Sequence, residues 1–175
     1  MSLFLGIEGG ATNTVCVVMD SKCNILGRSS GSGSNQYLIG IPAVATLIAE
    51  LSKEALLSAG LKVPTDDCPP VFAALGACMS GFLESSVQKT LESHFRSNFP
   101  WLSASYYIDN DSPGSIYTAA GDAGGCVIIA GTGSMGQLIT PSGATINCGG
   151  HGHMYGDGVC VCIVYRFFRP SFFSC

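Results

Sequence analysis

Short apolar runs separated by polar or glycine-rich breaks open the chain. They occupy residues 3–8, 14–20 and 25–30, and the breaks fall at 9–11 and 21–24. Breaks this short are typical of β-hairpins, so we expect an antiparallel three-stranded meander. The almost continuous apolar run at 15–19 indicates a strand covered on both faces.

Helical and extended patterns alternate after the third run. Apolar residues recur at helical spacing from 42 to 59, and Gly60 ends that segment. The remaining expected elements are a strand at 71–77, a helix at 83–96, a strand at 105–109 and a short helix at 112–119. Parallel neighbours need long crossovers, so this βββαβαβα order predicts an α/β domain with a mixed five-stranded sheet, of ribonuclease-H-like type.

Two further strands, at 126–130 and 137–139, begin the same pattern again. This repetition predicts a domain at 1–116 and the incomplete opening of a related second domain at 117–157. Residues 158–175 form an apolar tail broken by Arg166 and Arg169 and too short to span a bilayer. We expect this tail to be an aberrant or alternative end.

Composition and the first residues of the chain argue against several classes of binding partner. Only 11% of residues are charged and the net charge is −4, so we expect no nucleic-acid partner. The first residues lack a basic n-region, which predicts a cytoplasmic protein with no secretory signal and no membrane partner. The nine cysteines form no CxxC pair, and we expect most of them to be buried thiols.

Two turns rich in glycine and hydroxyl groups are candidates for holding phosphate. Gly10 and Thr12 lie in the first hairpin, and Gly131, Thr132 and Gly133 lie in its counterpart in the second domain. Backbone N–H groups and threonine hydroxyls at such turns suit an anion. Ordinary glycine turns are the alternative for each, but two matched hairpins could clamp a triphosphate from both sides.

Asp111 is the candidate for acid–base chemistry. It follows the strand at 105–109, and α/β sheets place ligands at the carboxyl ends of their strands. A carboxylate there could accept the proton of a sugar hydroxyl during phosphoryl transfer. The alternative is a helix N-cap before Ser112 and Pro113.

The glycine-rich segment 148–157 is a candidate ligand loop. His151 and Asp157 could hydrogen-bond a polyol or an amide, although a flexible loop with exposed histidines is the alternative. Cys148, His151 and His153 also suggest zinc, but a fourth ligand is missing.

Several segments taken in order resemble one family. They are 6–12, 34–40, 79–81, 111–115, 131–134 and 148–154. From residue 3 to about 157 the chain resembles the N-acetylglucosamine kinases, which belong to the actin-like ATPase superfold together with the BadF/BadG-type ATPases.

The resemblance implies phosphorylation of N-acetyl-D-glucosamine to its 6-phosphate, a step of amino-sugar salvage, with ATP and Mg²⁺. It implies Asp111 as the catalytic base, Thr12 and Thr132 on the ATP phosphates, and Glu8 near Mg²⁺ through water. The sugar contacts it implies are Asn35, Asp111, Gly150, His151, Gly152 and Asp157.

The chain also departs from the family. His151 stands where the family usually carries Trp, and after Asp157 an unrelated tail begins, so we expect little turnover from this chain. Two alternatives stay open: a non-catalytic sugar-binding splice or truncation product, and the activator ATPase of a radical dehydratase, for which Cys160 and Cys162 are poor support. The sequence also leaves open whether the chain forms a homodimer.

Overall fold

The computed structural model describes residues 2–130 and 134–150. The chain divides into two compact units, Met1–Asp111 and a second unit that begins at Ser112. The boundary expected at residue 116 falls inside a helix, and the assignment of domains stays a prediction. Each unit is described separately below.

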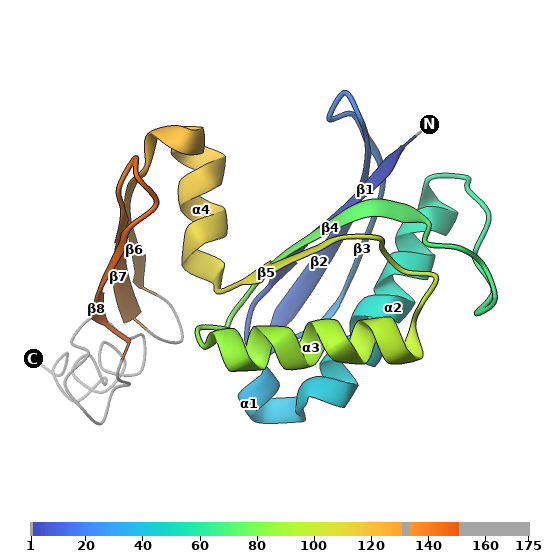
Figure 1. Ribbon diagram of the computed structural model, residues 1–175, viewed down its shortest axis with the longest axis horizontal. Helices are drawn as coiled ribbons and strands as arrows, with labels where there is room; N and C mark the ends of the chain where they lie inside the picture. Colours follow the sequence, from blue (N-terminus) through green and yellow to red (C-terminus); the bar gives the residue numbers. More distant parts are fainter. Residues whose placement is uncertain (1, 131–133, 151–175) are drawn as a thin grey trace, which may run out of the picture. The chain divides into compact units, whose positions relative to one another are not determined.

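A mixed five-stranded sheet forms the first unit (Figure 1). Its strands are β1 (Leu3–Gly9), β2 (Asn13–Asp20), β3 (Ile25–Ser32), β4 (Phe72–Met79) and β5 (Tyr106–Asp109), in the order β3-β2-β1-β4-β5. The first three pair antiparallel, whereas β4 is parallel to β1 and β5 is parallel to β4. The predicted sheet is therefore confirmed, with most strand ends within two residues of expectation.

The helices are α1 (Gln36–Ile39), α2 (Ile41–Ser58), α3 (Ser85–Asn98) and α4 (Asp111–Ala120). The sequence did not predict α1. It is separated from α2 by Gly40, whose φ of 80° is accessible to glycine at little cost. A short 3₁₀ turn, Gly121–Ala123, follows α4.

One face of the sheet carries the core. Leu5 and Ile7 of β1 and Cys16 and Val18 of β2 are buried in a single apolar cluster with the inner faces of α2 and α3. The residues between them in β2 are only half-buried. The expectation that the run at 15–19 is covered on both faces was therefore wrong: only its core-facing positions are fully buried.

Helix α2 lies close against the outer strand β3. A side chain on Gly27 would overlap the carbonyl of Ala55, so glycine permits this approach. Ser58 Oγ accepts the backbone N–H of Arg28 at 2.8 Å and donates to the carbonyl of the same residue at 3.0 Å. Ser29 Oγ donates to the carbonyl of Leu51 at 2.6 Å.

The second unit contains an antiparallel sheet of β6 (Gly125–Ala130), β7 (Ser134–Ile139) and β8 (Thr145–Gly149), in that order. The first two strands were predicted. The third was not, and it places Cys148 and Gly149 in a strand instead of the expected glycine loop. Residues 131–133 and the predicted tail at 158–175 lie outside the described residues.

Six cysteines fall within the described part of the chain, and all are free thiols. Only Cys16 among them is buried, while Cys23, Cys126 and Cys148 are exposed. The expectation of mostly buried thiols was wrong for this part of the chain. No helix among the described residues is long and apolar enough to cross a membrane.

Candidate functional site

Three segments of the first unit pack together at the carboxyl ends of β1 and β4. The backbone N–H of Ser34 donates to the carbonyl of Gly10 at 3.0 Å, and that of Ser80 donates to the carbonyl of Gly9 at 2.7 Å. The first hairpin turn, the loop after β3 and the loop after β4 therefore form one hydrogen-bonded cluster.

The first hairpin turn closes on itself. The N–H of Gly10 donates to the carbonyl of Asn13 at 2.7 Å, so this donor is used inside the turn. Thr12 is exposed at the tip, and Glu8 is exposed at the end of β1. An exposed hydroxyl in the turn, together with an exposed carboxylate on the strand that leads into it, fits a phosphate that carries a hydrated Mg²⁺, because Mg²⁺ typically takes one or two carboxylates and keeps several waters.

Asn35 joins the short helix α1 to the loop after β4. As the N-cap of α1, its Oδ1 accepts the N–H of Tyr37 at 2.9 Å. Its Nδ2 lies 3.5 Å from Ser80 Oγ. Gly81 has a φ of 89°, and a side chain there would come within 2.7 Å of Asn35 Oδ1. The amide is therefore held by a cap and by close packing.

Asp111 lies at the corresponding end of β5. It is half-buried in the first turn of α4, where the helix dipole favours a negative charge. The preceding carboxylate of Asp109 accepts the N–H of Asn110 at 2.7 Å through Oδ1 and the hydroxyl of Tyr107 at 2.9 Å through Oδ2. This bonding ties the segment before Asp111 to the strand.

The register of the sheet brings these strand ends to one edge. Glu8 pairs with Cys78, and Cys78 pairs with Asp109, across three parallel strands. The strand β3, which leads to Asn35, runs in the same direction as β1, because each is antiparallel to β2. Five predicted site residues of the first unit therefore lie at the same edge: Glu8, Gly10, Thr12, Asn35 and Asp111.

The remaining predicted residues belong to other parts of the chain. Gly131, Thr132, Gly133, His151, Gly152 and Asp157 lie outside the described residues. Gly150 belongs to the second unit, where it follows β8 with a φ of 82° and donates its N–H to the carbonyl of Ser134 at 3.0 Å. Within the described ranges, no group of three His, Cys, Asp or Glu side chains could hold a metal ion, and the histidines of the zinc alternative fall outside those ranges.

Sequence reasoning assigned no role to Gln88, which contacts the loop after β4, or to Asp109, which Gln88 also contacts. The feature that these two residues share in the sequence is a place at one end of an element. Asp109 ends β5, and Gln88 lies in the first turn of α3, the helix that precedes β5. Their contact joins residues 21 apart in the chain. No local pattern marks such a pair.

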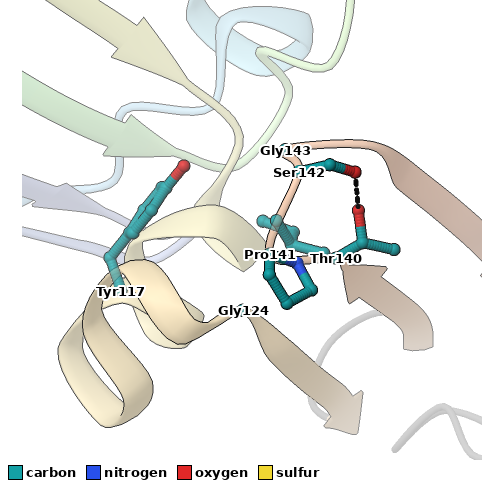
Figure 2. Close-up of a pocket in the computed structure, with 7 residues that line it drawn as sticks. Tyr117, Gly124, Thr140, Pro141, Ser142 and Gly143 are labelled. Atoms are coloured by element: carbon teal, nitrogen blue, oxygen red, sulfur yellow. Dashed lines mark hydrogen bonds between the residues drawn. The ribbon is translucent and has the colours of Figure 1, made fainter.

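A shallow pocket of about 330 Å³ lies in the second unit. Figure 2 shows Tyr117 on one side and the turn from Thr140 to Gly143 on the other, where the hydroxyls of Thr140 and Ser142 lie 2.9 Å apart. None of its lining residues is charged, and none belongs to the predicted site. This pocket therefore offers no carboxylate, imidazole or amine for catalysis.

The comparison with known protein families matches residues 5–161 to the BadF/BadG/BcrA/BcrD ATPase family. Over 157 residues the chain is 29% identical to the N-acetyl-D-glucosamine kinase of Dictyostelium discoideum, a match that covers 89% of this chain and 49% of the relative. The chain thus spans about half the length of the curated relative it matches.

Solved structures share the fold. A provisionally named N-acetylglucosamine kinase from Porphyromonas gingivalis superposes with a TM-score of 0.73 at 23% identity, covering 99% of this chain and 56% of that one. A ROK family glucokinase from Streptomyces griseus, solved with glucose and AMPPNP, gives a TM-score of 0.57 at 15% identity and covers 83% and 46%. With the family match extending over most of its length, the chain belongs to the BadF/BadG/BcrA/BcrD ATPase family.

Proposed function

We propose that this chain carries the sugar-binding and catalytic-base half of an ATP-dependent kinase that converts N-acetyl-D-glucosamine to its 6-phosphate. The observation that carries the proposal is the gathering of Thr12, Asn35 and Asp111 at one edge of the sheet, in a member of an ATPase family. The name of the Dictyostelium relative supports the choice of sugar. A cytoplasmic role in amino-sugar salvage belongs to the same proposal.

Asp111 is assigned the role of general base. Its carboxylate would accept the proton of the sugar hydroxyl as that oxygen bonds to the γ-phosphorus and the bond from this phosphorus to the departing ADP breaks. Asn35 is assigned to the sugar, because its Nδ2 group has two N–H donors and the structure pairs it with one distant hydroxyl, 3.5 Å away. Its Oδ1 is occupied by the cap of α1. The amide would therefore act as a donor to a sugar oxygen.

ATP, when bound, supplies the phosphoryl group, and Mg²⁺ neutralises the charge of the phosphates. In the first unit, the Thr12 hydroxyl would donate a hydrogen bond to a phosphate, and the Glu8 carboxylate would hold a water of the hydrated ion. The same proposal assigns Gly131, Thr132 and Gly133 to the phosphates, and Gly10 as part of the turn that presents Thr12, because its own N–H is bonded to Asn13. It assigns Gly150, His151, Gly152 and Asp157 to the sugar.

The experiment is a pair of measurements on the purified chain. Calorimetric titration with N-acetylglucosamine, with and without MgATP, reports binding, and a coupled assay reports the sugar 6-phosphate. For Asp111→Asn we expect product formation to fall by a factor on the order of 10²–10⁴, with sugar affinity changed less than tenfold. Absence of any binding of the sugar would overturn the proposal.

A non-catalytic sugar-binding protein is the second candidate. The observation that favours it is that the N–H of Gly10, in the turn proposed to hold phosphate, is already bonded to the carbonyl of Asn13. This second candidate predicts that the chain binds the sugar but forms no sugar 6-phosphate at any concentration of MgATP. The two measurements above therefore separate the candidates.

A further inference from the structure

The side-chain amide of Gln88 lies between two loops of the site. Gln88 is half-buried in the first turn of α3. Its Nε2 donates to the carbonyl of Phe82 at 2.8 Å and lies 3.4 Å from Asp109 Oδ1. The first distance is a normal hydrogen bond and the second is a long one. One amide group thus contacts the loop after β4 and the end of β5.

On the β4 side, the contact leads to Asn35. Phe82 is fully buried and follows Gly81 directly, so its carbonyl has little freedom to move. The carbonyl of Gly81 accepts Gln36 Nε2 at 3.3 Å, and the α-carbon of Gly81 packs against the Asn35 amide. A shift of the Phe82 carbonyl would therefore move the backbone of Gly81 and change the position of the Asn35 amide.

On the β5 side, the contact leads to Asp111. Asp109 already accepts the N–H of Asn110 and the hydroxyl of Tyr107, one on each carboxylate oxygen. The Gln88 amide approaches the oxygen that also holds the N–H of Asn110. It thereby restrains the carboxylate that fixes the backbone immediately before Asp111.

We propose that Gln88 is a positioning residue that sets the spacing between Asn35 and Asp111, and so the fit of the sugar. The inference rests on the proposed function in assigning the sugar to those two residues. Glutamine suits the position because its Nε2 carries two N–H donors and no charge. A glutamate of the same length would be an acceptor when ionised, facing both a carbonyl oxygen and the carboxylate of Asp109.

The test uses Gln88→Glu, with Ser93→Glu as the matched control. Ser93 is exposed on the same helix, so both variants add the same charge to α3. The other titratable groups on α3 and on the elements around it are Asp109, Tyr107 and Tyr106 on β5, Cys78 on β4, Glu8 on β1, Glu84, Lys89, Glu92, His94 and Arg96 in or next to α3, and Glu50, Lys53 and Glu54 on α2. The neighbouring Asp109 should raise the pKa of the introduced carboxyl group above about 4.3, its ordinary value.

Two readouts are followed from pH 8 down to about 4.5: the affinity for N-acetylglucosamine and the amide NMR signals of Gly81 and Asn110. For Gln88→Glu we expect about tenfold weaker sugar binding at pH 8 and displacement of both amide signals. Protonation at low pH restores an O–H donor, so binding and signals should return towards those of the unaltered chain. The control should match the unaltered chain at every pH.

The outcomes distinguish the inference from the function it rests on. If the unaltered chain binds no sugar, the proposed function fails, and the coupling is still judged by the amide signals. Displacement of only one of the two signals in Gln88→Glu would overturn the coupling. A loss of sugar affinity that is the same at pH 8 and pH 4.5 would also overturn it, since a merely structural loss has no reason to titrate.

Discussion

The α-carbon of Gly33 lies against the peptide that joins Ala11 to Thr12. A side chain on Gly33 would overlap the carbonyl of Ala11 and come within 2.8 Å of the backbone nitrogen of Thr12. The loop that carries Asn35 and the turn proposed to hold phosphate are therefore in direct backbone contact. The two proposed substrates would meet across this contact.

Replacement of Gly33 by alanine should separate the two loops. We expect Gly33→Ala to lower the free energy of unfolding by about 1–3 kcal/mol, because the added methyl group meets rigid backbone. Affinity for N-acetylglucosamine should fall with it. Gly76→Ala is the control, since a side chain at Gly76 would meet nothing within 4 Å. Urea unfolding and calorimetry of both variants make the comparison, and equal stability of the two would refute the tight packing.

Asn35 should show two separable roles. Asn35→Asp keeps an oxygen to accept the N–H of Tyr37 and loses the Nδ2 donors, whereas Asn35→Ala loses both. We expect the aspartate variant to keep its stability but bind the sugar at least about tenfold more weakly, as expected for a lost donor. The alanine variant should in addition lose about 1 kcal/mol of stability through the missing cap. Full sugar affinity in Asn35→Asp would remove Asn35 from the site.

Asp20 should make the stability depend on pH. The side-chain amide of Asn24 donates to its carboxylate at 2.8 Å, the main reason its pKa is lowered, and the N–H groups of Asn24 and Lys22 add to the effect. Because the pKa is lower in the folded state, the stabilisation is present above the unfolded pKa of about 3.9 and is lost as the pH falls through the folded value. Asp20→Ala should be less stable than the unaltered chain at pH 7, with the difference shrinking below about pH 4.

The control for this prediction is Asp66→Ala, which removes the same charge from an exposed loop. Urea unfolding at a series of pH values gives the differences in unfolding free energy. A deficit for Asp20→Ala that stays constant down to pH 3 would show that the carboxylate does not carry the effect.

Cys16 should be unreactive in the folded protein. Burial, reinforced by the negative charge of Glu54, raises the pKa of its thiol to about 12. The thiolate is the reactive form, so at pH 8 iodoacetamide should modify Cys23, Cys126 and Cys148 and leave Cys16 intact. Peptide mass spectrometry locates the label, and in guanidinium Cys16 should react like the others. Labelling of native Cys16 as fast as Cys23 would contradict its burial.

The sheet of the first unit was predictable because short breaks separate β1, β2 and β3, and because helical patterns precede β4 and β5. The helix α1 was not: it has four residues, too few to show a period, and Tyr37 and Leu38 are exposed at 67% and 70%. Four of the five residues of β8 are exposed, so no alternation of buried and polar positions marks it. The pairing of β8 with β7 forms only in the folded sheet, and no pattern within the strand itself indicates it.

Some features of the candidate site could likewise be predicted from the sequence, and others could not. The ends of strands are visible in sequence, but it is the register of the sheet that puts the segments around Thr12, Asn35 and Asp111 at one edge, and the roles of these residues stay predictions. The use of the Gly10 N–H inside its own turn could not be foreseen, because it depends on the conformation of the turn. Gln88 could not be identified either, since its contacts depend on where α3 lies.

The contact between Ser58 and Arg28 has a consequence for how the protein behaves in a crowded solution. The strand β3 borders the sheet, and the unpaired N–H and C=O groups of a border strand can recruit a strand from another molecule. At Arg28 both groups are already bonded to one serine hydroxyl, and α2 lies against the strand. A second chain that tried to extend the sheet there would have to displace the helix first, so this border should resist the growth of aggregates.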